Sequence, residues 1–365
     1  FNLTSDSDLF WDSDELIEEK DAGMEGNCLK SENKLYLPLY EAKMIHQADH
    51  RYATYDDGEI REATQDEHRS PVWLPSSRHW VERGKLPFES NWYLSFRDIA
   101  RTTDVRTGIF SVTPAVAFGN SAPVILSSRS ATESSVLLAN CNSTPFDFIV
   151  RQKLGGTHLN FYILKQLPVR RPERYTPELL GCIVPRILEL TYTAWDLTAF
   201  SDDIWNEASE DLRAAIKSQW QSNVDATGGG HSGEQPPKWV ERSDQADEEF
   251  PHPPFMWDGE RRRFLRAELD ALYGHLYGLS HDELDYILET FPIVKDQDIE
   301  EFGDYRTKKL ILHCFDQLEE AIEQGKAYDP ILDLPAIELG DIRPESESEG
   351  AETVDEPMHA STPSA

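Results

Sequence analysis

The sequence FDFIVRQKLGGTHLNFYILKQLPV, residues 146–169, decides the architecture that we expect for this chain. Its first apolar residues recur at helical spacing and follow Thr144, a predicted N-cap, with Pro145 in the first turn. Gly155 is the predicted left-handed cap at the end of this helix. A second short helix is predicted over residues 159–167, ending at the proline that follows. The glycines between the two helices therefore indicate a structural turn rather than a phosphate-binding loop.

Strand patterns precede this stretch and helical patterns follow it. Residues 35–45 and 92–126 contain short β-like runs separated by turn residues. Residues 258–279 carry leucines at helical spacing, and Ser280 with Glu283 forms the signature of a capping box for the next helix. We therefore expect an α+β fold, in which a mixed α/β domain is followed by a helical C-terminal region.

Composition divides the chain into five expected segments. Three consecutive glycines and several prolines indicate a linker, and an acidic end containing Ser and Pro is typical of disorder. The segments are an acidic, partly flexible N-terminal segment (1–34), an α/β domain (35–200), a linker-rich connection (201–255), a helical domain (256–330) and an acidic disordered tail (331–365).

The charge is strongly negative but unevenly distributed. The net charge is −32, with 13 Lys and 22 Arg among the cations. Such a composition is typical of proteins that fold at high salt, and also of acidic proteins with disordered ends. Residues 69–174, however, carry fourteen cations and seven acidic residues, with Trp73, Trp80 and Trp92 among them. Cations beside planar rings suit nucleic acid, whereas pairing with the acidic flanks would make this segment an ordinary solvated surface.

Several classes of protein are not indicated. The sequence has no run of about 18 apolar residues, so we expect no membrane partner. The four cysteines are far apart and form no C-x-x-C pair, which favours a cytoplasmic location. Motifs for dinucleotides, nucleotide phosphates, zinc proteases and serine hydrolases are absent from the sequence. We therefore predict no catalytic residue and no metal ligand.

One catalytic alternative stays open. Glu41-Ala42-Lys43, on a predicted strand, fits the second half of a metal-dependent nuclease signature, in which carboxylates hold the metal and Lys lies beside the attacking water. His46, Asp49 and His50 could also bind a metal, but the sequence around them favours an extended loop whose histidines face DNA or are structural.

Several long strings of the sequence resemble one family. Besides the opening stretch, they are LPLYEAKMIHQADHRYATY, WYLSFRDIARTTDVRT, LTYTAWDL and the region from RAELDALYGHL to YRTKKLIL. Together, over about residues 35–325, they resemble the C-terminal target-recognition half of adenine-specific DNA methyltransferases from type IIG-like restriction–modification and phage-defence systems.

The resemblance implies recognition of double-stranded DNA rather than catalysis. In that family an N-terminal Rossmann-like domain binds S-adenosylmethionine and carries an N-P-P-[YF] motif, while the C-terminal half reads the DNA from which adenine is flipped. The His-Pro-Pro-Phe at 252–255 lacks the Asn and is interpreted as a helix-entry loop. We therefore expect no cofactor in this chain, S-adenosylmethionine in the complete enzyme, and a methyltransferase domain or subunit as partner.

The candidate DNA contacts come from the basic segment. Arginine can clamp a phosphate or read a guanine edge, and threonine can donate to a phosphate. The predicted DNA-binding residues are Arg97, Arg101, Arg106, Arg151, Lys153 and His158. The remaining alternative is an acidic adaptor protein without nucleic-acid binding.

Overall fold

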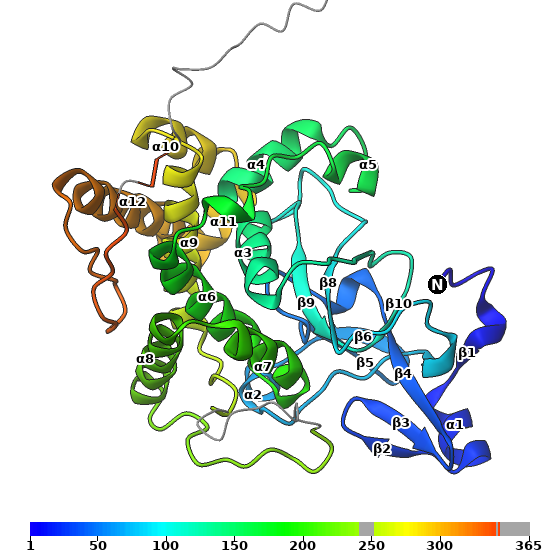
Figure 1. Ribbon diagram of the computed structural model, residues 1–365. Coiled ribbons are helices and arrows are strands. Elements are labelled where there is room, and N and C mark those ends of the chain that lie inside the picture. The colour runs from blue at the N-terminus through cyan, green and yellow to red at the C-terminus, as the bar shows by residue number, and fades with distance from the viewer. Residues whose placement is uncertain (241–251, 341, 344–365) are drawn as a thin grey trace, which may run out of the picture.

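The N-terminal part of the chain builds a six-stranded sheet. The computed structural model describes residues 1–240, 252–340, 342 and 343. Five strands pair in the order β1-β7-β4-β3-β2, all antiparallel, and β10 adds to β4 in parallel (Figure 1). The strands are β1 (Phe10–Trp11), β2 (Gly23–Glu25), β3 (Cys28–Ser31), β4 (Lys34–Tyr40), β7 (Trp80–Glu82) and β10 (Ala117–Phe118).

The expected partly flexible segment at residues 1–34 is instead part of this sheet. It contains η1 (Ser7–Leu9), β1, α1 (Ser13–Lys20), β2 and β3. Leu16 and Leu29 are fully buried in a small core with Trp80. Apolar residues spaced among the acidic ones therefore anchor the segment to the sheet, which its acidic composition did not indicate.

Two smaller sheets complete the β part. β8 (Trp92–Phe96) lies between β11 (Val124–Ile125) and β9 (Phe110–Pro114), all antiparallel, and β5 (Ala53–Asp56) pairs with β6 (Glu59–Glu62). Phe96 and Phe110 stack with ring centroids 5.5 Å apart, and both belong to the main hydrophobic core. These two rings therefore anchor the end of this sheet in that core. Short elements between the strands are η2 (Ala42–Met44), α2 (Gln65–Arg69) and η3 (Arg83–Lys85).

Helices form the rest of the molecule, at the left and top of Figure 1. The first group is α3 (Ala131–Asn142), α4 (Thr144–Lys153), α5 (Phe161–Leu164), η4 (Pro172–Arg174), α6 (Pro177–Thr191), η5 (Trp195–Leu197), α7 (Thr198–Glu207) and α8 (Glu210–Ala226). The second group is α9 (Gly259–Leu276), α10 (His281–Glu289), α11 (Pro292–Phe302) and α12 (Arg306–Gln324). The mixture of helices and antiparallel sheets confirms the predicted α+β class.

Two predicted boundaries differ from the structure. Residues 201–226 are helical rather than linker, because Ile204, Trp205 and Ile216 are buried on faces of α7 and α8. Residues 331–340 are not a free tail, since Leu332 and Leu339 are buried in the main core. The remainder of the predicted tail, residues 344–365, lies outside the described residues, as do residues 241–251 of the predicted linker.

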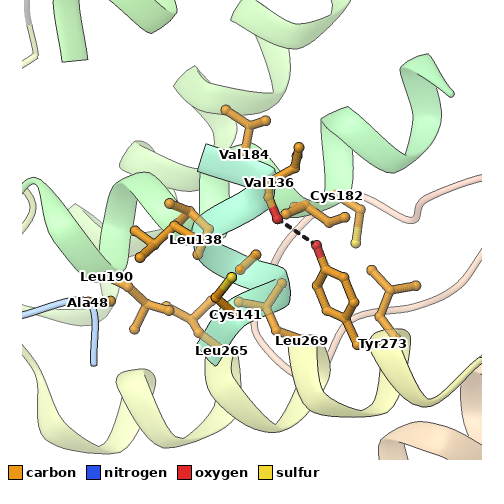
Figure 2. Packing of buried hydrophobic residues seen from close by; sticks show 14 of the residues in the cluster. Ala48, Val136, Leu138, Cys141, Cys182, Val184, Leu190, Leu265, Leu269 and Tyr273 are labelled. Carbon is orange, nitrogen blue, oxygen red and sulfur yellow. Dashed lines mark hydrogen bonds between the residues drawn. The ribbon is translucent and has the colours of Figure 1, made fainter. Parts of the chain in front are cut away.

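One hydrophobic core joins the two groups of helices. Figure 2 shows α9 residues Leu265, Leu269 and Tyr273 against α3 and α6, with the Tyr273 hydroxyl donating to the carbonyl of Val136 at 2.9 Å. The same cluster extends from Ala48 to Ile342. The expected helical domain at 256–330 therefore shares its core with the α/β part. In the part of the chain that is described, no helix is both long and apolar enough to cross a membrane.

The helix pair of residues 144–167 exists, with different ends. The Ser143 hydroxyl caps α4 by accepting from the amide of Phe146 at 3.4 Å. The helix then ends at Leu154, an extended residue (φ −78°, ψ 101°) that is itself buried. Gly155 is not among the glycines with positive φ, so the predicted left-handed cap is wrong. The chain leaves α4 in an extended path toward the loop between β8 and β9.

Candidate nucleic-acid interface

Two loops lie against each other at the end of the β8–β9 hairpin. Loop L1 (residues 97–109) joins β8 to β9, and loop L2 (residues 154–160) joins α4 to α5. The amide of Ala100 donates to the carbonyl of Thr157 at 3.0 Å, and the amide of Leu159 donates to the carbonyl of Asp98 at 2.7 Å. Because Leu159 is fully buried, it fixes the paired loops to the core.

Exposed cations and apolar rings project from these loops and from α5. Tyr162 is 77% exposed, Ile99 52% and Phe161 42%, although large apolar side chains are usually covered in a folded domain. The ring of Phe161 makes an edge contact with the buried ring of Phe96, at 5.4 Å between centroids. We call nine of the exposed residues the loop face: Ile99, Arg101, Thr102, Thr103, Lys153, Thr157, His158, Phe161 and Tyr162. The acidic Asp104 of L1 is exposed as well.

Three of the six predicted contact residues belong to the loop face. Arg101 and Lys153 are exposed, and neither side chain has an ion-pair partner among the residues that the structure describes. The side chain of His158 is 60% exposed, and its Nδ1 lies 2.6 Å from Oδ2 of Asp98. For Nε2 of His158, no partner is found in the described chain. The contact with Asp98 orients the ring and leaves its other nitrogen for a ligand.

Arg106 and Arg151 lie inside the protein, contrary to the prediction that they contact DNA. Their side chains are 12% and 7% exposed, and both approach Asp147, at 3.9 and 3.7 Å. Arg106 also donates to Oγ1 of Thr144 at 2.7 Å, while Arg151 stacks 4.0 Å from the ring centre of Phe291. Both arginines therefore hold α4 to L1 and to the C-terminal helices.

Asp147 is the centre of this internal cluster. Burial raises the pKa of its carboxyl, although Arg106, Arg151 and the amides of Gly108 and Thr107 oppose the rise. The amide of Gly108 donates to Oδ1 of Asp147 at 2.7 Å. A buried carboxylate needs such partners. Arg106 and Arg151 therefore stabilise Asp147 rather than face a ligand.

Arg97 has an intermediate position at the start of L1. Its Nε donates to the carbonyl of Ile45 at 2.8 Å, and its guanidinium lies 5.4 Å from the ring centre of Tyr52. Burial lowers the pKa of this side chain. The residue is half-buried and anchors L1, so it is not part of the exposed loop face.

The residues that suggested a nuclease form no metal site in the described part of the chain. Glu41 lies just after β4 rather than on a strand, and its Oε1 accepts from the Tyr55 hydroxyl at 2.7 Å. His50 contacts Asp196 at 3.0 Å and is buried, as expected for a structural histidine. Within the described ranges, no group of three or more His, Cys, Asp or Glu side chains could hold a metal ion.

The strand topology also bears on S-adenosylmethionine. A Rossmann-like cofactor domain requires several parallel strands with crossover helices. Among the residues with described structure, the one parallel pair is β4–β10, and the remaining pairs are antiparallel. The described part of the chain therefore does not have the topology of a Rossmann-like cofactor domain.

Comparisons of the chain with protein-family models, with curated proteins and with solved structures gave no match.

Sequence reasoning missed the aromatic part of the loop face. Phe161 and Tyr162 lie in the short helix predicted over residues 159–167, whereas α5 has only the four residues Phe161–Leu164. Asn160 is the N-cap, and its side chain accepts from the amide of Ile163 at 3.1 Å. The helix therefore begins at Phe161, two residues later than predicted. The available signal was the order Asn-Phe-Tyr, in which the N-cap residue is followed directly by two aromatic residues. This order places both rings in the first turn of the helix, on its exposed side.

Proposed function

We propose that this chain is the recognition module of an adenine-specific DNA methyltransferase, and that the loop face contacts double-stranded DNA. The observation that carries the proposal is the grouping of free cations with exposed aromatic rings on the paired loops and on the ends of α4 and α5 that flank L2. The resemblance of the sequence to target-recognition halves supports the same class of ligand. The methyl-transfer domain and its S-adenosylmethionine are then supplied by another part of a longer protein or by a separate subunit.

The side chains of the loop face suit both kinds of DNA contact. Arg101 and Lys153 can bind phosphate oxygens, and Thr102 and Thr103 can donate to them. His158, held by Asp98, can donate or accept at a base edge through Nε2. Tyr162 offers a flat apolar surface for a thymine methyl group or a sugar.

The acidic remainder of the molecule makes binding dependent on this one surface. A net charge of −32 repels the phosphate backbone elsewhere, so non-specific association is expected to be weak. Binding should therefore require the loop face and should weaken steeply as salt increases.

The test is fluorescence anisotropy with 30-base-pair duplexes selected from a random pool by the unmodified protein. The variant Arg101→Ala/Lys153→Ala is expected to lose roughly tenfold or more in affinity and to reduce the slope of log K against log salt by about two. Arg83→Ala/Lys85→Ala, which removes two exposed cations from η3, is the matched control and should bind normally.

Equal affinity of the Arg101→Ala/Lys153→Ala variant and the control would exclude the loop face as the binding surface. If the random pool gives no binding sequence at low salt, the recognition function itself is refuted, and the adaptor alternative gains support.

A further inference from the structure

A groove of about 440 Å³ lies between α6, α8 and the segment 334–338. This groove is separate from the loop face, since it shares no residue or element with it. The residues of its walls are mostly apolar. They include Pro185, Leu212, Ala215, Leu334, Pro335 and Ile337.

Arg186, in the wall of the groove, has a buried side-chain donor without a partner. Arg186 is 1% exposed and lines the groove. Its Nε donates to Glu268 at 2.9 Å and its Nη1 to the carbonyl of Cys182 at 2.8 Å, but its buried Nη2 has no hydrogen-bond partner. Because Nη2 has almost no accessible surface, a molecule in the groove does not reach it. Glu268 balances the charge of Arg186, so this side chain adds no free cation to the groove.

An acceptor lies close by on the same helix. Pro185 is inside α6 and has no amide hydrogen, so the carbonyl of Gly181, four residues earlier, lacks its helical donor. Gly181 also lines the groove, and a Cβ added there would meet no atom within 4 Å. The groove thus presents an unused acceptor beside open space, and a main-chain amide of a peptide can donate to it.

The third wall of the groove is held in place by hydrogen bonds. Glu268 accepts from the hydroxyl of Tyr328 at 2.8 Å and from the amide of Ile331 at 3.1 Å. The backbones of Tyr328 and Ile337 pair with each other at 2.6 and 2.7 Å. The segment 334–338 is therefore fixed before any ligand arrives, which reduces the entropic cost of binding.

The rim of the groove selects the charge of the ligand. Glu178, Asp211 and Glu338 are exposed residues that line it, and Arg186, already neutralised, is the one cation among the lining residues. A bound segment that carries Lys or Arg next to apolar side chains would complement this rim.

We propose that this groove binds an extended peptide segment of a partner protein, apolar and basic in sequence, with a main-chain amide of the peptide donating to the Gly181 carbonyl. This inference does not depend on DNA binding, because the groove and the loop face share no residue.

The test uses a fluorescein-labelled peptide, acetyl-Leu-Lys-Leu-Lys-amide, and fluorescence anisotropy with the full chain. Gly181→Leu places a side chain in the open space of the groove and is compatible with a helix. The variant is expected to lower affinity roughly tenfold or more. Gly259→Leu is the matched control, since Gly259 is an exposed helical glycine whose added Cβ also meets nothing within 4 Å, but outside the groove. Thermal unfolding of both variants checks that they fold.

A second variant tests the charge of the rim. Glu178→Lys/Asp211→Lys should weaken the lysine peptide and strengthen the corresponding peptide with Glu in place of Lys. The proposal is overturned if the lysine peptide does not bind at concentrations up to about 1 mM. It is also overturned if Gly181→Leu and Gly259→Leu bind equally, or if reversing the rim charge leaves the preference unchanged.

Discussion

Buried arginines stabilise this molecule by bonding segments that are distant in the sequence. Arg51 is fully buried, and its Nη2 donates to the carbonyls of His68 and Thr193 at 2.8 and 3.0 Å, while Nη1 donates to the carbonyl of Ser70 at 2.8 Å. Such a guanidinium satisfies carbonyls that no regular element pairs. Part of the cation content of the chain is therefore structural, and its position cannot be deduced from a count of charges.

His46 should make the protein less stable in acid. Burial, helped by the nearby charges of Arg97 and Arg266, lowers the pKa of this ring from 6.5 to about 3. Between these values the unfolded chain binds a proton that the folded chain does not, so stability decreases as pH falls through this window. From pH 7.5 to 4.5 this contribution amounts to about 2 to 3 kcal/mol, which His46→Gln should remove from the difference in unfolding free energy between these pH values. Urea unfolding at both pH values measures it.

His281→Gln is the control for this experiment, because the His281 side chain is 42% exposed. If His46→Gln and His281→Gln show the same loss of stability between pH 7.5 and 4.5, the buried ring is not the cause.

At the scale of single elements, the glycines of the chain differ in their tolerance. Gly155 has no positive φ, and a Cβ added to it would meet no atom within 4 Å, whereas Gly303 ends α11 with φ of +77°. Gly155→Ala should therefore change the free energy of unfolding by less than about 0.5 kcal/mol, and Gly303→Ala should lower it by about 1 kcal/mol. Thermal or urea unfolding of the two variants provides the comparison. A larger loss for Gly155→Ala would indicate that L2 requires a left-handed residue.

Elements with strong local signals were predictable, and those fixed by distant contacts were not. The apolar run at 35–45 gives β4, and the leucine spacing with the Ser280–Glu283 box gives α9 and the start of α10. The end of α4, by contrast, depends on Leu154 being buried next to loops that are far away in the sequence. The acidic composition of residues 1–34 and 331–365 suggested flexibility, but several leucines in residues 1–34 and 331–340 are buried. Their burial depends on tertiary contacts that composition does not reveal.

At the scale of the whole molecule, the shared core predicts that the C-terminal helices are required for folding. Leu265, Leu272 and Tyr273 of α9 are buried in the cluster that also contains α3 and α6. A chain that ends at residue 255 should lose its near-ultraviolet circular dichroism and its cooperative thermal transition, whereas a chain that ends at residue 343 should keep both. Cooperative unfolding of the shorter chain would show that the α/β part is an independent domain after all.

The candidate interface was only partly predictable, because one charge pattern serves two purposes. Arg101, Lys153 and His158 are on the loop face, while Arg106 and Arg151 surround Asp147 in the interior. All five lie in the same basic segment, and their difference in burial arises from the packing of α4 against L1 and the C-terminal helices.

The pairing of L1 with L2 has a consequence for how this surface can evolve. The hydrogen bonds from Ala100 to Thr157 and from Leu159 to Asp98 join backbone amides to backbone carbonyls. Every residue except proline has both of these groups. Exchange of the side chains at the exposed positions between them therefore leaves the path of both loops intact. Mutation can diversify what the surface contacts while the scaffold beneath it stays constant.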